Sequence, residues 1–262
     1  MRIDSKLKLL KYHLKGRVLA AAPGAYWRLR RALRGVWEPE ILLVKYLCND
    51  ASVCLDIGAH FGMYTYELSR RCARVEAFEP IPALVSVLSK GYRGNLRVGV
   101  HAVALSDMNG ETTLRVPRAG WGRSTIEASN PLEGRRDPTA PVDQVRVEMR
   151  TLDSYSFTGV DFIKMDVEGH ELAVLAGASE TLRREEPALL VEIETRHCHQ
   201  KEAGVTVHDS MASFNYEAYQ FDGTRLVLSQ NADEPRFQSN NYLFLQRRHL
   251  DALARGGVPH SR

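Results

Sequence analysis

The sequence of 262 residues lacks a long hydrophobic run. The longest candidate, residues 18–27, is broken by Pro23 and Gly24 and falls well short of the ~18 apolar residues that a membrane-spanning helix needs. Internal repeats and low-complexity tracts are also absent, and 44% hydrophobic and 26% charged residues are ordinary values for a globular protein. We therefore expect a folded protein of one or two domains with no membrane-spanning helix.

Cysteine is scarce, and its four positions form no metal-binding pattern. Cys48, Cys54, Cys72 and Cys198 include no CxxC pair, and none has zinc-finger spacing to a histidine pair. A secretory signal is not expected, because the short apolar stretch near the N-terminus has basic residues on both sides. We predict reduced thiols and a cytoplasmic location, with a position at the periphery of a membrane as an open alternative.

Positive charge is concentrated at the N-terminus. Residues 1–37 contain ten Lys or Arg and one acid, a net +9, which leaves −6 for the remainder of a chain whose total is +3. One interpretation is an arm that contacts a membrane surface or a polyanion, with Leu7, Leu10 and Leu14 on one helical face. The alternative is a pair of amphipathic helices packed on the body with their basic face in solvent. A transit peptide is also Arg-rich and poor in acids.

Hydrophobic runs alternate with helical patterns from about residue 38 onward. This alternation predicts an α/β fold with a doubly wound, mostly parallel sheet, and the Asp222-Gly223 turn predicts an antiparallel hairpin near the C-terminal end. We expect a basic helical extension over 1–36, a main domain over 37–248 and a tail over 249–262. The expected strands are 52–57, 74–78, 97–105, 112–116, 145–149, 162–167, 188–194, 217–221, 224–228 and 241–246; the expected helices are 37–48, 62–71, 82–90, 171–184 and 207–214.

Three successive strand ends each carry an acid. Asp56 begins the turn Asp-Ile-Gly-Ala-His-Phe-Gly, Glu79 follows the second strand, and Asp107 follows the third. The turn is not the GxGxxG of dinucleotide-binding proteins, and three acids would repel a phosphate-bearing cofactor. A cation with a ribose and an adenine fits better, because a carboxylate accepts hydrogen bonds from ribose hydroxyls. Taken singly, Asp56 could cap the next helix, Glu79 could be a surface carboxylate, and Asp107 could belong to a turn.

These motifs, in this order, resemble the FkbM family of methyltransferases. The matching segments are VCLDIGAHFGMYT (53–65), VEAFEPIPALVSVL (75–88), VALSDMNGE (103–111), RTLDSY (150–155), DFIKMDVEGHELAVLAGA (161–178) and LLVEIE (189–194). The resemblance implies a class I, Rossmann-like methyltransferase fold, S-adenosylmethionine as cofactor, and O-methylation of a hydroxyl on a sugar, a glycan or glycolipid, or a glycosylated natural product. By position, the implied cofactor-binding residues are Asp56, Gly58, Gly62, Glu79 and Asp107.

The fourth core strand carries charged residues on one face. Lys164, Asp166 and Glu168 are two residues apart, as are Glu192 and Glu194 at the end of the neighbouring strand. Buried charges need partners, so we expect Lys164 to pair with one of these carboxylates at the edge of the active site. The alternative is an ion-pair network that only shapes the site.

Methyl transfer to an alcohol requires a proton acceptor. Glu168 and His170 follow the strand end and are the best-placed general bases, with His197 and His199 as weaker rivals. A divalent metal bound by Asp166, Glu168 and Glu194 would also acidify the hydroxyl. Their spacing matches no recognised metal motif, so we predict no metal site.

Residues 117–143 form a long segment without hydrophobic periodicity. It contains Trp121 and Arg123, and also Arg118, Arg135 and Arg136, with Gly120 and Gly122 on either side of the tryptophan. We expect either a lid over a sugar- or phosphate-bearing acceptor or a solvated loop. The candidate substrate residues are Trp121, Arg123, Glu194 and His197.

Other functions remain open at the level of the sequence. The basic arm would suit an RNA methyltransferase, although the acidic body and the absence of an RNA-binding motif argue against it. A catalytically silent binding module is the second alternative, against which the complete set of cofactor-site acids argues. We expect a small-molecule or glycan acceptor as partner, no DNA, and leave open a homo-oligomer and a membrane-surface contact through the N-terminus.

Overall fold

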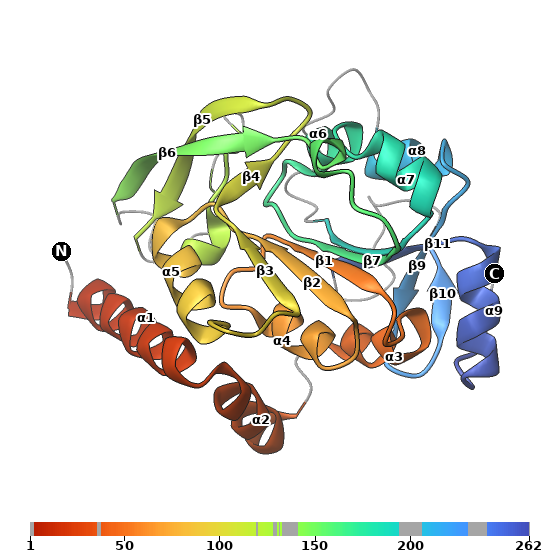
Figure 1. The fold of residues 1–262 in the computed structure, drawn as a ribbon, viewed down its shortest axis with the longest axis horizontal. Helices are drawn as coiled ribbons and strands as arrows, with labels where there is room; N and C mark the ends of the chain where they lie inside the picture. The colour runs from red at the N-terminus through yellow and green to blue at the C-terminus, as the bar shows by residue number, and fades with distance from the viewer. Residues whose placement is uncertain are drawn as a thin grey trace.

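The computed structural model describes residues 3–35, 38–118, 120–127, 130, 132, 141–193, 206–229 and 240–261. Within these residues a nine-stranded sheet forms the centre of the molecule (Figure 1), in the order β12-β10-β9-β11-β8-β7-β1-β2-β3. Its strands are β1 (Val53–Ile57), β2 (Arg74–Phe78), β3 (Val98–His101), β7 (Val160–Met165), β8 (Ala188–Glu192), β9 (Glu217–Phe221), β10 (Leu226–Leu228), β11 (Asn241–Leu245) and β12 (His260–Ser261).

The sheet is parallel from β3 to β8. β11 then pairs antiparallel with β8, and β9 pairs antiparallel with β11. The β9–β10 hairpin turns at Asp222, whose carboxylate accepts the backbone N–H groups of Thr224 and Arg225. The chain proceeds from β1 to β2 and β3 on one side, and β7 and β8 lie on the other, so the order reverses at β1. Open sheets of this kind bind ligands at the carboxyl ends of the strands beside that reversal. The expected fold class is confirmed.

Helices cover both faces of the sheet. On one face, Ile163 and Val191 pack against α6 (Glu171–Ala176), α7 (Ser179–Glu185) and α8 (Val207–Ala212). On the other, Phe162 and Leu190 pack against α3 (Val44–Leu47), α4 (Met63–Ser69) and α9 (Arg247–Arg255). The alternation of these apolar residues along β7 and β8 therefore supplies both cores of a three-layer fold.

Three expected elements are divided in the structure. The strand expected over 97–105 breaks at Ala102 into β3 and β4 (Val103–Leu105), and β4 joins a separate sheet of order β4-β6-β5 with β6 (Val142–Arg150) and β5 (Gly110–Pro117). The helix expected over 171–184 breaks between α6 and α7. The helix expected over 37–48 consists of a 3-10 turn, η1 (Pro39–Leu42), and the short α3.

The N-terminal extension forms α1 (Ile3–Ala21) and α2 (Pro23–Arg34), both packed on the body. Leu19 and Trp27 are buried, and Gly16 lets α1 approach α5 (Pro82–Gly91) closely, since a Cβ there would lie 3.1 Å from Cγ2 of Val87. The arrangement agrees with the second interpretation of the basic segment, a pair of helices packed on the body. No helix among the described residues combines the length and apolar character required to cross a bilayer.

The C-terminal residues belong to the main fold. The boundary expected between 248 and 249 falls inside α9, which begins at Arg247 and buries Leu250 and Leu253. Beyond it, β12 pairs with β10 at the edge of the sheet. The separate tail over 249–262 is therefore corrected: this segment packs against α3 and closes one edge of the sheet.

Candidate functional site

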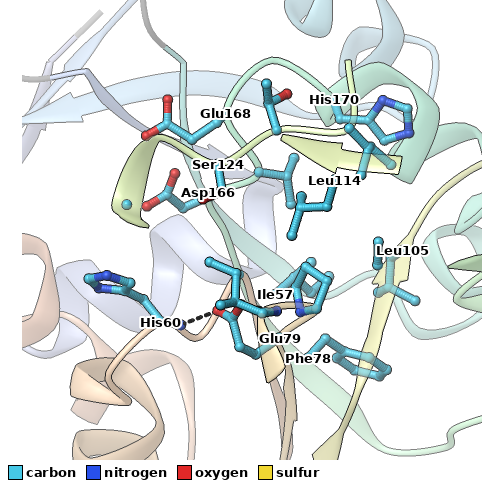
Figure 2. Close-up of a pocket in the computed structure, with 18 of the residues that line it drawn as sticks. Ile57, His60, Phe78, Glu79, Leu105, Leu114, Ser124, Asp166, Glu168 and His170 are labelled. Carbon is cyan, nitrogen blue, oxygen red and sulfur yellow. Dashed lines mark hydrogen bonds between the residues drawn. The ribbon is translucent and has the colours of Figure 1, made fainter. Parts of the chain in front are cut away.

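A pocket opens where the parallel strand order reverses. Its walls come from the ends of β1, β2 and β7, from β4 and β5, and from residues 121–126. The space between these walls, including the solvent at its open mouth, is about 680 Å³. Figure 2 shows side chains from these separate elements converging on one space.

Glu79 lies in this pocket directly after β2. Its Oε2 accepts the backbone N–H of His60 at 2.8 Å, drawn in Figure 2, and its Oε1 accepts that of Ile81 at 2.8 Å. The residue is only 4% exposed, and this burial raises the pKa of Glu79 to about 7. Each oxygen retains a second acceptor position, so the carboxylate can bind a ribose diol while it holds the two loops.

The turn after β1 depends on Gly58. Its φ is +78°, and a Cβ at this position would lie 1.9 Å from the backbone oxygen of Asp166. The chain after β7 therefore passes directly over the turn. Gly62 also has a positive φ, of +77°, and begins α4 away from the pocket wall. Both glycines shape the turn, and of the two only Gly58 lines the pocket.

Asp56 is buried beneath the turn and does not line the pocket. Its Oδ2 accepts the backbone N–H of Thr65 at 2.7 Å and the Thr65 hydroxyl. Burial raises the pKa of Asp56 to about 6, although the two hydrogen bonds from Thr65 act to lower it. The structure thus places Asp56 at the first turn of α4, where it satisfies a free helix N–H.

Asp107 is exposed and also lies outside the pocket wall. Its Oδ1 accepts a hydrogen bond from the hydroxyl of Ser106 at 3.0 Å. Of the three strand-end acids that the sequence suggested, the structure brings only Glu79 into the pocket.

The segment after β7 brings two carboxylates to the pocket. Asp166 and Glu168 both line it, and Figure 2 shows their side chains on the same side of the space. Burial, together with the nearby Glu192, raises the pKa of Asp166 well above its usual value. Glu168 has a φ of +53°, and its backbone oxygen accepts a hydrogen bond from Nδ2 of the buried Asn130 at 2.8 Å.

His170 lines the opposite part of the pocket and is held from both sides. Its Nε2 lies 2.9 Å from Oγ of Ser106, and its Nδ1 lies 3.4 Å from Oε2 of Glu127. Ser106 follows β4, and Glu127 ends the segment that includes Trp121. The imidazole therefore has a fixed orientation, with a carboxylate on one nitrogen and a hydroxyl on the other.

Lys164 is buried on the sheet face that packs against α4, outside the pocket wall. The expected pairing with a carboxylate is confirmed, since Nζ lies 3.9 Å from Oε2 of Glu192. The ammonium also lies 5.5 Å from the ring centre of Tyr64. Burial disfavours the charged ammonium, but Asp166 and the other surrounding carboxylates raise the pKa of Lys164 on balance.

Trp121 forms part of the pocket rim and is shared with the N-terminal extension. Its ring lies 6.4 Å from that of Phe61 in a stacked arrangement and 6.0 Å from that of His13 on α1. It also lines a second hollow of about 460 Å³ between α1 and α5, beside Arg17 and Lys90. Arg123 lies on the same 3-10 turn, η2 (Trp121–Arg123), but does not line the pocket.

Several predicted positions lie outside the described residues. These are Glu194, His197 and His199, with Cys198, Arg135 and Arg136. The substrate contacts expected of Glu194 and His197, the role of His197 and His199 as rival bases, and the reduced thiol of Cys198 remain predictions.

His60 is a pocket residue to which the sequence gave little weight. Its backbone is left-handed, with a φ of 51°, and its Nε2 is buried with no hydrogen-bond partner among the described residues. Burial, reinforced by the charge of Lys15, lowers the pKa of His60 to about 3, so the ring is neutral near pH 7. In the sequence, the indication that His60 lines the pocket was its position between Gly58 and Gly62, because a glycine turn at this place directs a side chain over the strand ends.

Among the described residues, no third side chain joins Asp166 and Glu168 in a group that could hold a metal ion. The one group of potential ligands there is Cys48, Cys54 and Cys72, which are buried free thiols whose sulfur atoms lie within 4.8 Å of one another. They surround the beginning of β1, at the opposite end of that strand from the pocket.

The pocket fits S-adenosylmethionine on three observations. Gly58 leaves no side chain over the turn, Glu79 offers acceptors for a ribose diol, and Ile81 and Leu105 supply apolar walls for an adenine. The neighbouring Asp166 and Glu168 would face a sulfonium charge favourably. The fold and this pocket together define a class I methyltransferase.

Comparison with known proteins assigns the family. A family model for the methyltransferase FkbM domain matches residues 56–234, and the chain belongs to this family of S-adenosylmethionine-dependent methyltransferases. The chain is 27% identical over 175 residues to the 2-O-methyltransferase NoeI of Sinorhizobium fredii, covering 60% of this chain and 72% of NoeI. It is 26% identical over 149 residues to Methyltransferase 1 of Beauveria bassiana, covering 49% of this chain and 59% of that protein.

Among solved structures, the chain is similar to an FkbM methyltransferase from Methylobacillus flagellatus. The identity is 17% and the TM-score is 0.46, and the match covers 75% of this chain and 44% of that one. The chain thus spans less than two thirds of two of the relatives that it matches.

Proposed function

We propose that this protein transfers the methyl group of S-adenosylmethionine to a hydroxyl of a sugar, a glycan or a glycosylated natural product. The observation that supports the proposal is that residues suited to both halves of such a site line one pocket. Glu79 and the Gly58 turn lie on the cofactor side, and Glu168 and His170 line the same space. The name of NoeI, a 2-O-methyltransferase, supports a hydroxyl acceptor.

A carbohydrate acceptor is supported by the rim of the pocket. Trp121 offers an aromatic face of the kind on which the apolar face of a sugar ring packs, and Ser124 and Thr125 beside it carry hydroxyls. A few polar groups on a mainly apolar wall fix the orientation of a ligand.

The reaction requires an in-line displacement and the removal of one proton. S-adenosylmethionine supplies an electrophilic methyl group on a sulfonium. Glu79 and the Gly58 turn hold the ligand in place, and the pocket walls hold the acceptor hydroxyl near attack distance, which can supply as much as about 7–11 kcal/mol of the rate enhancement. The acceptor hydroxyl takes the place of Ser106 beside Nε2 of His170, and this nitrogen accepts its proton. The Glu127 carboxylate, 3.4 Å from Nδ1, stabilises the imidazolium that forms.

The cofactor half of the proposal is tested by calorimetric titration of S-adenosylhomocysteine. We expect the wild-type protein to bind it and Glu79→Ala to lose most of the affinity. Glu111→Ala is the matched control, because that carboxylate is exposed on β5 and its ion pair is with the surface residue Arg146. Absence of binding by a folded wild-type protein would contradict the cofactor assignment and favour a silent module.

The acceptor half is tested by mass spectrometry of a panel of glycans and glycolipids incubated with methyl-labelled S-adenosylmethionine. A gain of one methyl ether on a sugar hydroxyl is the expected product. RNA is included in the panel, and methylation of RNA with no methylation of any glycan would overturn the proposed acceptor class.

A further inference from the structure

The outward faces of α1 and α2 combine exposed apolar side chains with basic ones. Among the described residues, seven large hydrophobic side chains are exposed, and four of them lie on these two helices: Leu14 at 61%, Val18 at 44%, Leu29 at 61% and Leu33 at 74%. Isolated exposed apolar residues are normal on protein surfaces. These four are arranged as two pairs, each four residues apart, which places each pair on one face of its helix.

The cations of the same helices whose side chains the structure describes fall into two groups. Lys15, Arg30 and Arg31 are only partly exposed and contact the body or α2 itself: Lys15 lies 4.0 Å from the ring centre of Phe61, Arg30 lies 5.6 Å from that of Trp27, and Arg31 forms a 3.0 Å ion pair with Glu67. These contacts hold the two helices on the molecule.

The second group points to solvent. Its members are exposed and have no carboxylate within ion-pair distance in the described part of the chain: Lys11, Arg17, Arg28 and Arg34. Lys11 and Arg17 flank the Leu14–Val18 pair, and Arg28 and Arg34 flank the Leu29–Leu33 pair.

We propose that α1 and α2 form a docking surface for an anionic lipid bilayer. Apolar side chains between basic ones describe a helix that lies in the plane of a membrane interface, with leucines below the headgroups and cations among the lipid phosphates. Nucleic acid would use the cations but leave four large apolar side chains exposed to water, so a bilayer accounts for both halves of the surface.

The surface is rigidly connected to the active-site pocket. Gly91 of α5 leaves room for the backbone oxygen of Leu19, and His13 of α1 contacts Trp121 at the pocket rim. α1 thus carries the exposed Leu14–Val18 pair on one side and contacts the pocket rim through His13 on another. The docking itself goes beyond the proposed function and does not depend on it.

The test is sedimentation of the full chain with vesicles of phosphatidylcholine, with and without phosphatidylglycerol. We expect binding only to vesicles with phosphatidylglycerol, weakened by salt. The variant Leu29→Ser/Leu33→Ser should lower the partition coefficient at least about tenfold. The variant Arg17→Glu/Arg28→Glu should lower it further, because each basic residue contributes about fivefold at an anionic surface.

Matched controls lie on other elements of the fold. Met108 is 57% exposed in the turn before β5, and Arg247 is exposed on α9, so Met108→Ser and Arg247→Glu should leave vesicle binding unchanged. Calorimetry with S-adenosylhomocysteine on the same samples reports on the pocket separately. Three results would each overturn the docking surface. The first is an equal loss of vesicle binding in the controls, and the second is no binding to anionic vesicles. The third is that single-stranded RNA binds more tightly than vesicles and binds the Leu29→Ser/Leu33→Ser variant as well as the wild type.

Discussion

The carboxylate of Glu79 accepts the backbone N–H of His60 at 2.8 Å, so one buried side chain joins the turn after β1 to the end of β2. The same carboxylate faces the pocket. The shape of the turn and the affinity for a ribose therefore depend on one group, and any change in its charge affects both.

Binding of S-adenosylhomocysteine should depend on pH through Glu79. Burial raises the pKa of this carboxyl from 4.5 to about 7 in the free protein. Ribose hydroxyls that donate to the carboxylate favour its ionised form, so binding lowers the pKa and releases a proton. Affinity should therefore fall as the pH decreases below about 7, by at most about tenfold per pH unit, and level off above it. Calorimetry across this pH range measures the effect.

The variant Glu79→Gln provides the control for this pH dependence. It should bind more weakly and lack the part of the pH dependence that the carboxyl supplies. A wild-type affinity that stays constant between about pH 6 and about pH 8 would show that Glu79 does not change its protonation on binding.

Replacement of Gly58 by alanine should destabilise the protein. The new Cβ would meet the backbone oxygen of Asp166 at 1.9 Å, at a φ of +78° that alanine rarely adopts. Overpacking and the left-handed backbone together should lower the free energy of unfolding by about 2–4 kcal/mol. Gly120→Ala is the control, because its φ is −174° and no atom lies within 4 Å of a Cβ there. Urea denaturation that gives equal stabilities for the two variants would contradict this account.

His170→Ala should lower the rate of methyl transfer roughly 10²–10⁴-fold while leaving the affinity for S-adenosylhomocysteine unchanged. Glu127→Gln and Ser106→Ala should give smaller losses, because these residues position the imidazole at 3.4 Å and 2.9 Å from its two nitrogens. The measurement is kcat with any acceptor found active. If His170→Ala keeps full activity and Glu168→Gln loses it, Glu168 is the base.

Lys164→Met should destabilise the fold more at neutral pH than in acid. Removing the ammonium leaves the partly buried Asp166 and Glu192 without their cation. Loss of one partner of a fully buried pair costs about 3–5 kcal/mol, so we expect a smaller loss of about 1–3 kcal/mol here. Burial raises the pKa of Asp56 to about 6 and that of Asp166 in the same direction. Carboxylates of this cluster therefore take up protons as the pH falls, and the deficit should shrink toward about pH 5. Thermal unfolding at both pH values measures this, with the exposed Lys45→Met as control. An equal deficit at both pH values would argue against the carboxylate cluster.

The core strands could be predicted from the sequence because they are short apolar runs, and β1, β2, β7 and β8 lie within two residues of their expected bounds. The break at Ala102 could not, because β3 and β4 have the same local pattern and differ only in the strand with which each pairs. The break between α6 and α7 could not be predicted for the same reason. It coincides with a tertiary contact at Gly177, where a Cβ would lie 2.0 Å from the backbone oxygen of Ser106.

The site was predictable in position more than in the direction of its side chains. The order of the motifs indicated which strand ends meet, and Glu79, Asp166, Glu168 and His170 do line one pocket. The sequence could not decide whether the Asp56 carboxylate binds a ligand or accepts the backbone N–H of Thr65, because both roles require an acid at the same position. The contact of Glu127 with His170 spans 43 residues and leaves no local signal.

The position of Trp121 between the pocket and α1 has a thermodynamic consequence. The Trp121 ring lines the pocket and also contacts His13 of α1. A ligand in the pocket that shifts this ring therefore changes the free energy with which α1 binds a partner, and a partner on α1 changes the free energy of ligand binding in the pocket. Such coupling is reciprocal. If a bilayer bound at α1 tightens acceptor binding by some factor, the bound acceptor tightens bilayer binding by the same factor. Enzyme carrying its acceptor would then leave the bilayer more slowly than enzyme without it.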